Sequence, residues 1–212
     1  MDIFFYNVFL RLYGAVILIV SLFNKKAKLW VKGREGIFDK LRNSIQGEQA
    51  VIWMHCASLG EFEQGRPVLE RVKEQNPGHK FLLTFFSPSG YEVRKNYDGA
   101  DWVFYLPLDL KANAEKFLDI VKPKLVIFVK YEYWYHYLHN IHRRNIPAIL
   151  ISAIFRENAV FFKWYGSVHR KMLTYFDHIF VQTPDSYERV SQLISPSDIT
   201  LAGDTRFDRV LS

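Results

Sequence analysis

The feature that most constrains the fold is an alternation of short apolar segments with helical patterns, which begins near residue 50. Seven apolar, β-rich segments span residues 50–54, 81–86, 102–106, 125–129, 148–152, 178–181 and 199–201. Helical patterns separate most of them, over residues 65–75, 90–96, 111–121, 133–143, 161–175 and 184–193. Strands that alternate with helices of this length are typical of βαβ units and a mainly parallel sheet. The sequence therefore predicts an α/β fold with helices on both faces of the sheet.

Two further signs support a parallel sheet in one continuous domain. The segments LVIFV (125–129) and AILIS (148–152) are apolar on both faces, as expected where helices cover both sides of the sheet. Proline or glycine follows several of the helical patterns, as at Asn76-Pro77-Gly78, Pro123 and Pro147. No long linker divides residues 50 to 205, so we predict one domain over residues 50–212.

The N-terminal segment, residues 1–24, is the strongest compositional outlier. It is almost wholly apolar from Ile3 to Phe23, which just reaches the roughly 20 residues that a membrane-spanning helix needs. Arg11 opposes a spanning position, and the acidic start at Asp2 opposes a signal peptide. We predict a membrane anchor, either spanning or monotopic; the alternative is a helix that packs on its own domain or on a partner.

Residues 25–49 are predicted to form a basic connecting segment with a short helical pattern around residues 37–45. Its cluster of Lys and Arg, between residues 25 and 34, would hold the rest of the chain on the cytoplasmic side. The formal net charge of the whole chain is +6, which suits anionic partners such as phosphorylated lipids or a membrane surface.

Several classes of protein lose support because their sequence signatures are missing. The single cysteine, Cys56, excludes an intrachain disulfide and a metal site built from cysteines. There is no G-x-G-x-x-G after a strand and no P-loop, which argues against dinucleotide binding and ATP hydrolysis. Asp-x-Asp is also missing, and no nucleic-acid recognition module is evident.

The turn after the first predicted strand carries the first candidate for chemistry. Ser58-Leu59-Gly60-Glu61 lies between that strand and a helix, at the edge where ligands bind in open α/β sheets. Glu61 there can act as a general base. The same four residues match a capping box, in which Ser58 and Glu61 satisfy free backbone donors, and the helix dipole would then lower the pKa of Glu61. The residues alone leave both interpretations open.

Three other segments follow predicted strands. Ser87-Pro88-Ser89-Gly90 can present backbone N–H groups to an anion or form an ordinary helix cap. The segment 130–134, which includes Lys130 and Glu132, can contact a sugar or form a solvated first turn of a helix. Arg156 is a candidate phosphate or carboxylate contact, or a surface arginine.

Three histidines at three-residue spacing, His136, His139 and His142, lie near one face of a predicted helix. No cysteine or carboxylate cluster accompanies them, so we predict surface histidines and no metal site. Residues 203–208 are predicted to form a turn after the last strand.

Six motifs in register resemble the N-terminal half of the 3-deoxy-D-manno-octulosonic acid (Kdo) transferase family. They are HCASLGEFEQGRPVL (55–69), TFFSPSGYE (84–92), YLPLD (105–109), PKLVIFVKYEYWYHYL (123–138), ISAIFRE (151–157) and AGDTRFDRV (202–210). The order and spacing match from about residue 3 to the end of the chain, including the apolar N-terminus. Several separate motifs in order are far more specific than any one of them.

The resemblance implies a Rossmann-like acceptor-binding domain, the N-terminal half of a GT-B glycosyltransferase, at the cytoplasmic face of the bacterial inner membrane. Such enzymes transfer Kdo from CMP-Kdo to a lipid A precursor in lipopolysaccharide synthesis, with inversion and without a metal or other cofactor. Glu61 then corresponds to the family's proposed general base. The implied acceptor-binding residues are Ser58, Gly60, Ser87, Ser89, Gly90, Lys130, Glu132 and Arg156.

This sequence departs from the family pattern in two respects. The family motif Glu-x-Glu-x-Trp reads Lys130-Tyr131-Glu132-Tyr133-Trp134 here, so a lysine that can meet an acceptor phosphate replaces the first glutamate. The chain also stops just after the motif that leads into the C-terminal, donor-binding half. We therefore expect residues 1–212 to be an acceptor-side half that is inactive alone. Alternatives are a non-catalytic membrane-tethered α/β binding module and a GT-B enzyme for another sugar.

Overall fold

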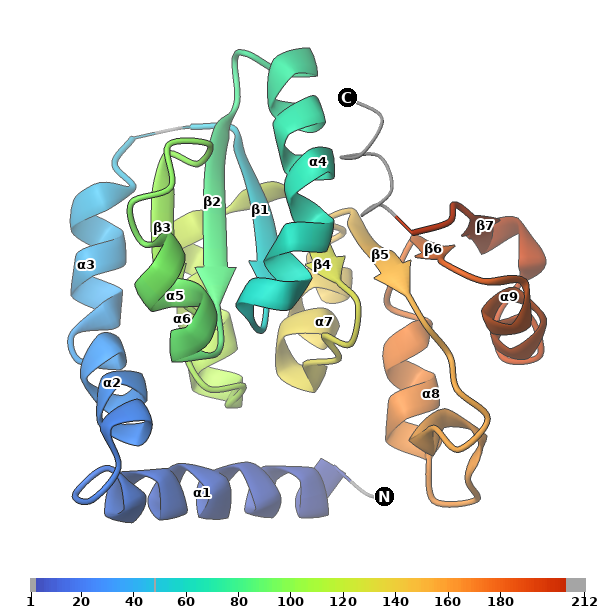
Figure 1. The fold of residues 1–212 in the computed structure, drawn as a ribbon, viewed down its shortest axis with the longest axis horizontal. Helices are drawn as coiled ribbons and strands as arrows, with labels where there is room; N and C mark the ends of the chain where they lie inside the picture. Colours follow the sequence, from blue (N-terminus) through green and yellow to red (C-terminus); the bar gives the residue numbers. More distant parts are fainter. Residues whose placement is uncertain (1–2, 48, 205–212) are drawn as a thin grey trace.

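The computed structural model describes residues 3–47 and 49–204, which fold around a parallel sheet of seven strands (Figure 1). The strands are β1 (Val51–Cys56), β2 (Lys80–Phe85), β3 (Trp102–Tyr105), β4 (Pro123–Val129), β5 (Ala148–Ala153), β6 (His178–Val181) and β7 (Ile199–Leu201). Their order across the sheet is β3-β2-β1-β4-β5-β6-β7, and every neighbouring pair is parallel. The predicted α/β fold with a parallel sheet is confirmed.

Helices cover both faces of the sheet. They are α1 (Ile3–Val20), α2 (Lys25–Arg34), α3 (Ile37–Ser44), α4 (Leu59–Gln75), α5 (Pro88–Arg94), α6 (Lys111–Val121), α7 (Tyr135–Arg143), α8 (Ser167–Leu173) and α9 (Pro184–Val190), with 3₁₀ turns at Val160–Phe162 and Pro196–Asp198. The core on one face includes Phe62 and Leu69 of α4. The core on the other face includes Phe117 of α6 and Leu138 of α7.

Alternation along β1 divides this central strand between the two cores. Trp53 packs on one face against the rings of Phe117 and Tyr137, with ring centroids 4.7 and 5.7 Å apart. Met54 lies in the core of the opposite face. All six residues of β1 are buried, as parallel strands covered on both faces require.

The position of β1 beside β4 makes a topological switch point at the carboxyl edge of the sheet, the place where open α/β sheets have a crevice. From β1 the chain order runs outward to β2 and β3 on one side, and from β4 to β5, β6 and β7 on the other. The connections that leave β1 and β4 therefore diverge, α4 to one face and α7 to the other. Ligands of open α/β sheets bind at such a switch point.

The N-terminal helix α1 lies across this same end of the molecule, beneath the points of the strand arrows in Figure 1. One side of α1 is fixed by the buried Tyr6, whose hydroxyl donates to the Asp109 carboxylate at 2.5 Å. Asp109 also accepts from the backbone N–H groups of His136 and Tyr137 at 3.0 and 2.9 Å. These N–H groups belong to the first turn of α7, which has no side-chain bond from its own N-cap, so Asp109 caps α7 from another segment.

Three details of the chain differ from the sequence predictions. Residues 161–175 are not one helix, because the chain turns over residues 163–166 and Arg170 bonds the carbonyl oxygens of Phe161 and Lys163. The basic segment contains a second helix, α2, in addition to the expected one around residues 37–45. His136 is buried instead of exposed, with its Nε2 2.6 Å from Asn7 Oδ1 of α1. Of the predicted turn over residues 203–208, residues 205–208 lie outside the described part of the chain.

The bond between Tyr6 and Asp109 predicts the effect of removing one hydroxyl. Tyr6→Phe keeps the packed ring but leaves the buried carboxylate with one donor fewer, so we expect a loss of about 1.5–3 kcal/mol of unfolding free energy. Urea unfolding in a mild detergent, followed by circular dichroism, measures it. Tyr13→Phe on the same helix is the matched control, and an equal loss in both variants would contradict the prediction.

Candidate functional site

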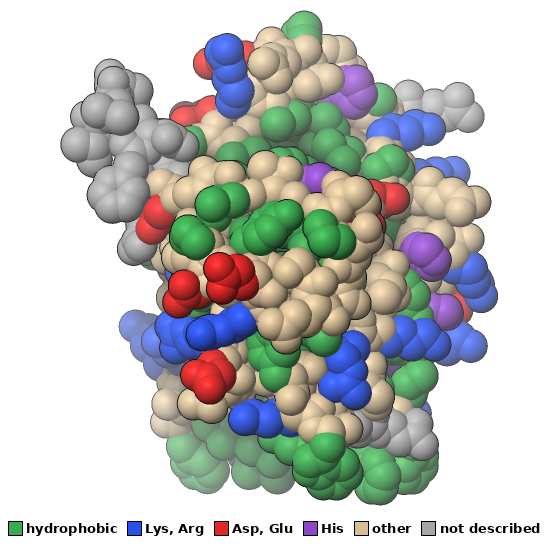
Figure 2. Space-filling view, turned by 90° about the vertical axis from the view of Figure 1, so that its right-hand side faces the viewer, with side chains coloured by type: hydrophobic (Ala, Val, Ile, Leu, Met, Phe, Trp, Pro, Cys, Tyr) green, Lys and Arg blue, Asp and Glu red, His purple; other side chains and the backbone are tan. Residues whose placement is uncertain are grey.

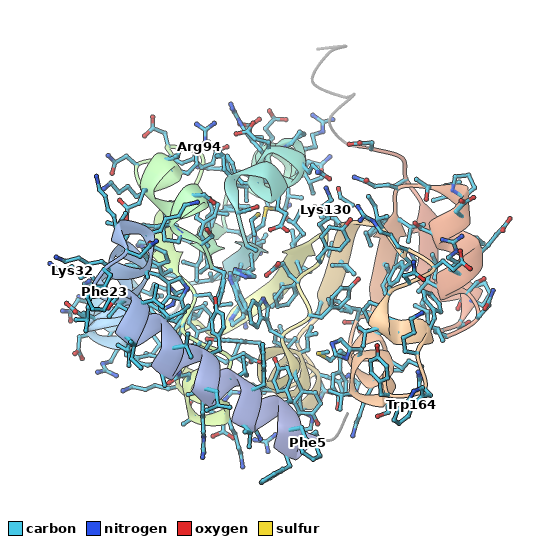
Figure 3. The ribbon with its side chains drawn as sticks, turned by 60° about the horizontal axis from the view of Figure 1, so that its bottom comes forward. Phe5, Phe23, Lys32, Arg94, Lys130 and Trp164 are labelled. Carbon is cyan, nitrogen blue, oxygen red and sulfur yellow. The ribbon has the colours of Figure 1, made fainter. Side chains whose placement is uncertain are left out.

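The switch-point crevice brings together the turn after β1 and the turn after β4. Glu61 lies in the first turn of α4, and Lys130 and Glu132 lie in the segment between β4 and α7. Because β1 pairs with β4 directly, these segments leave the sheet side by side. In Figure 3, which brings the α1 side forward, Lys130 lies near the middle of the molecule. The sequence-based placement of Glu61 and the 130–134 segment at one sheet edge is confirmed.

Glu61 forms the predicted capping box with Ser58, and its Oε2 accepts the Ser58 backbone N–H at 3.0 Å. Burial, and then the negative charge of Glu132, raise the pKa of Glu61 to about 7. Hydrogen bonds from the backbone of Ala57 and Ser58 and the positive charge of Lys130 oppose this rise in pKa but do not outweigh it. The expectation that the helix terminus lowers this pKa is therefore wrong, because loss of hydration costs more than the helix end supplies.

Glu132 is buried and close enough to Glu61 for its charge to act on it. Its Oε2 is 2.9 Å from His55 Nε2 of β1 and accepts the indole N–H of Trp134 at 2.6 Å. These contacts hold the Glu132 side chain inside the crevice. Glu132 therefore acts on the site through its charge on Glu61, and not as an exposed contact surface.

His55 is fully buried and connects Glu132 to the neighbouring strand β2. Its Nδ1 lies 2.8 Å from Thr84 Oγ1, which also accepts the Trp53 indole N–H at 2.7 Å. His55 Nδ1 also lies 3.1 Å from the Thr84 carbonyl oxygen. The imidazole ring is therefore held between Thr84 of β2 on one side and the Glu132 carboxylate on the other. Sequence reasoning gave His55 no role, although a histidine in an otherwise apolar strand was a possible signal.

Lys130 directly follows β4 and has a backbone φ of +70°. A lysine in this left-handed region is uncommon, and such strain is found at functional sites where the surroundings hold it in place. Here its backbone N–H donates to Ile151 O at 2.8 Å, and its ammonium lies 5.6 Å from the Tyr131 ring centroid. The lysine therefore supplies a positive charge beside the two glutamates.

The serine turn after β2 borders the same edge. Ser87 caps α5, since its Oγ accepts the Ser89 backbone N–H at 3.3 Å, and the two hydroxyl oxygens lie 3.0 Å apart. Gly90 is buried, its N–H donates to Ser87 O, and a Cβ there would meet the Phe85 ring at 2.2 Å. The absence of a side chain at Gly90 therefore serves packing against Phe85. Gly60, in contrast, is exposed, and nothing lies within 4 Å of where its Cβ would be.

Arg156 lies farther along the sheet, beyond the end of β5. It is exposed and borders a cavity of about 300 Å³ together with Tyr131, Ile154, Asn158 and Phe161. Tyr131 directly follows Lys130, so this cavity adjoins the segment 130–134. No group of three or more metal-binding side chains occurs among residues 3–47 and 49–204.

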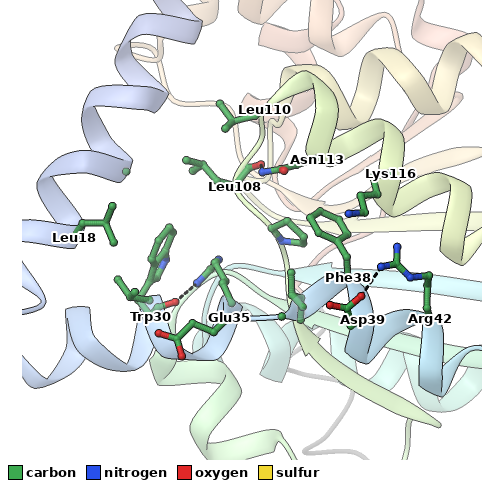
Figure 4. A pocket seen from close by; sticks show the side chains of 16 residues that line it. Leu18, Trp30, Glu35, Phe38, Asp39, Arg42, Leu108, Leu110, Asn113 and Lys116 are labelled. Atoms are coloured by element: carbon green, nitrogen blue, oxygen red, sulfur yellow. Dashed lines mark hydrogen bonds and ion pairs between the residues drawn. The ribbon is translucent and has the colours of Figure 1, made fainter.

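Aromatic rings connect α1 with the crevice. Tyr13 stacks on Phe86 with ring centroids 6.2 Å apart, and Phe86 packs on Trp134 at 4.7 Å. A cavity of about 340 Å³ lies along this path, bordered by Tyr13, Phe86 and Ser87. A larger one, of about 490 Å³, lies beyond α1 between Leu18, Trp30, Phe38 and Leu108 (Figure 4).

A sequence model of the 3-deoxy-D-manno-octulosonic-acid transferase (kdotransferase) family matches residues 31–209. The chain belongs to this family. Curated Kdo transferases resemble it along most of its length: the protein of Aquifex aeolicus is 32% identical over 150 residues, and that of Haemophilus influenzae is 29% identical over 162 residues. These matches cover 70% and 74% of the chain but 38% of each relative. The chain thus spans well under half the length of the Kdo transferases that it matches.

Solved structures with the same fold include two UDP-N-acetylglucosamine 2-epimerases. The enzyme from Neisseria meningitidis, bound to UDP-GlcNAc, has a TM-score of 0.58 and 16% identity, over 76% of this chain and 48% of that one. The enzyme from Methanocaldococcus jannaschii has a TM-score of 0.54 and 14% identity, over 77% of this chain and 48% of that one. At this identity the likeness concerns the fold alone, and it agrees with the expected Rossmann-like parallel sheet.

The charges around Glu61 predict how its pKa responds to substitution. Glu132→Gln removes a negative charge and should lower the Glu61 pKa from about 7, whereas Lys130→Met removes a positive charge and should raise it. Carbon-13 NMR of the glutamate carboxyl groups against pH measures both shifts, with the signal assigned through Glu61→Gln. Glu74→Gln, at the far end of α4, is the control. An unchanged midpoint in Glu132→Gln would mean that burial alone sets the pKa.

Proposed function

We propose that this chain is the acceptor-binding, base-carrying part of a glycosyltransferase that transfers Kdo from CMP-Kdo to a lipid A precursor in lipopolysaccharide synthesis. The observation that carries the proposal is Glu61, a partly buried carboxylate at the switch-point crevice of a Kdo transferase family member, with its pKa raised to about 7. A base with a pKa near the working pH combines a useful deprotonated fraction with strong proton affinity.

In the proposed reaction, an acceptor glucosamine hydroxyl oxygen attacks the anomeric carbon of Kdo. Its proton passes to Glu61 as the new carbon–oxygen bond forms. The bond from the anomeric carbon to the phosphate oxygen breaks, and its electron pair leaves with CMP. Attack opposite the leaving group inverts the anomeric centre, and we propose that no metal or other cofactor takes part.

The other site residues receive two kinds of role. We propose that Ser58, Gly60, Ser87, Ser89, Lys130 and Arg156 face the acceptor. Lys130 and Arg156 suit its phosphate groups, because cations bind phosphate through charge-assisted hydrogen bonds. Glu132 and Gly90 do not contact the acceptor in this proposal. Glu132 raises the pKa of Glu61, and Gly90 lets α5 pack closely on Phe85.

The N-terminal helix supports attachment to the cytoplasmic face of the inner membrane. By length and composition, α1 could cross a bilayer. One side of α1 is instead fixed to the domain through Tyr6, while Phe5, Phe9 and Leu12 are exposed on the other. We therefore propose a monotopic helix that lies in the membrane surface, where the exposed Lys25, Lys26, Lys28 and Lys32 meet anionic lipids.

Glu61→Gln in the full-length enzyme that contains this chain tests the proposed base. Glutamine keeps the capping bond to Ser58 but cannot take a proton, so kcat should fall by about 10²–10⁴ while acceptor binding stays unchanged. Transfer from CMP-Kdo to a lipid A precursor is the assay, with other nucleotide sugars as parallel donors and Glu74→Gln as the control. Near-normal turnover would leave Glu61 as a helix cap only, and transfer from another donor would identify a different glycosyltransferase.

The raised pKa of Glu61 also predicts the pH dependence of transfer. Only the deprotonated carboxylate accepts a proton, so kcat/KM of the full-length enzyme should rise with pH and level off above about 7. Glu132→Gln should move this inflection to lower pH, because it removes a charge that disfavours ionisation of Glu61. An inflection that is the same in both enzymes would assign the titration to another group.

A further inference from the structure

The segment between β5 and α8 descends to the level of α1, at the end of the molecule toward which the strands point (Figure 1). Its tip carries Trp164 and Tyr165, and 90% of the Trp164 surface is exposed. The two rings meet edge to face at 5.5 Å. An indole this exposed leaves a large apolar area in water unless something covers it.

This segment is a braced structure that projects its tip outward. Phe161 is buried at its base, with its ring centroid 4.8 Å from that of Tyr133 and 5.5 Å from that of Phe155. Arg170 of α8 donates to the carbonyl oxygens of Phe161 and Lys163, both at 2.9 Å. The backbone is therefore tied on both sides of the tip, and the exposure of Trp164 follows from that geometry.

The chemistry around the tip matches a membrane interface. Trp and Tyr are the residues that concentrate at the headgroup level of bilayers, since their rings are apolar with one polar group. The exposed Arg156 and Lys171 lie in and just after this segment, and both suit anionic headgroups. In Figure 2, hydrophobic side chains gather along the lower edge of the molecule, and Lys and Arg side chains lie directly above them.

Two separated contacts fix an orientation that a single helix would leave free. Figure 3 shows Phe23 and Phe5 toward opposite ends of α1, and Trp164 to the side of the Phe5 end, off the line of the helix. One helix in the membrane surface permits rotation about its own axis. A second contact displaced from that axis stops the rotation and holds the carboxyl edge of the sheet against the lipid.

We propose that Trp164 and Tyr165 form a second membrane contact, which inserts into the headgroup region of an anionic bilayer and, together with α1, turns the switch-point crevice toward the membrane. This inference rests on the proposed membrane attachment through α1. It does not depend on the donor sugar or on the role of Glu61.

The single native cysteine, which is buried, allows a direct test on the 212-residue chain. In the Trp164→Cys variant, an environment-sensitive fluorophore such as NBD is attached to the new cysteine. Glu74→Cys, at the exposed C-terminal end of α4, is labelled in the same way as the matched control. With phosphatidylglycerol vesicles, the probe at 164 should shift to the blue and be quenched by lipids spin-labelled near the headgroup. The probe at 74 should do neither.

Unlabelled Trp164→Ser completes the test through vesicle co-sedimentation. The partition coefficient of this variant should fall about tenfold, because one large apolar side chain is no longer transferred from water to the bilayer.

Three outcomes would contradict the proposal. A chain that co-sediments while the probe at 164 behaves like the probe at 74 overturns the second contact and leaves α1 attachment intact. A chain that does not co-sediment overturns both. A blue shift at 164 that grows with protein concentration without vesicles would assign the tip to self-association. None of these measurements needs transfer activity, so their failure is distinct from failure of the proposed reaction.

Discussion

The parallel pairing of β1 with β4 is the constraint on which the rest of the structure depends. These two strands lie beside each other at the centre of the sheet, and the chain leaves them toward opposite faces. The crevice between the two connections is the only reason that Glu61 and Glu132, 71 positions apart in the numbering, can act on one another. A different neighbour for β1 would keep every local motif and separate the two carboxylates.

Burial makes the charges of Glu61 and its neighbours costly, and opposing interactions at the crevice offset part of that cost. Glu61 loses hydration, and Glu132 adds a second negative charge beside it, yet backbone donors and Lys130 keep its pKa near 7. Glu132 in turn is held by His55 and Trp134, and His55 by Thr84. Close polar contacts thus connect β1 and β2 with the carboxylate that raises the pKa of Glu61. Lys130 adds a positive charge that offsets part of the cost of placing two carboxylates together.

The helix α1 joins the core, the site and the exposed surface. Its Tyr6 completes the shell of donors around the buried Asp109, which caps α7, and its Tyr13 contacts the aromatic rings that lead to Trp134. The opposite side of the helix is apolar and exposed. A helix that both stabilises the domain and offers an apolar surface cannot move independently of the site, which favours a domain held at the membrane over one on a flexible tether.

The sequence by itself determined the seven strands, the parallel sheet, the capping box at Ser58 and Glu61, and the family, because periodicity and local motifs are encoded along the chain. It could not determine the pKa of Glu61, since the helix terminus is a local effect whereas burial and Glu132 come from distant segments. It gave His55 and Asp109 no role, placed His136 at the surface, and joined residues 161–175 into one helix. In each case the deciding partner, such as Asn7 for His136 or Arg170 for the 163–166 turn, is brought into contact only by packing. Tertiary structure alone decided which charges meet.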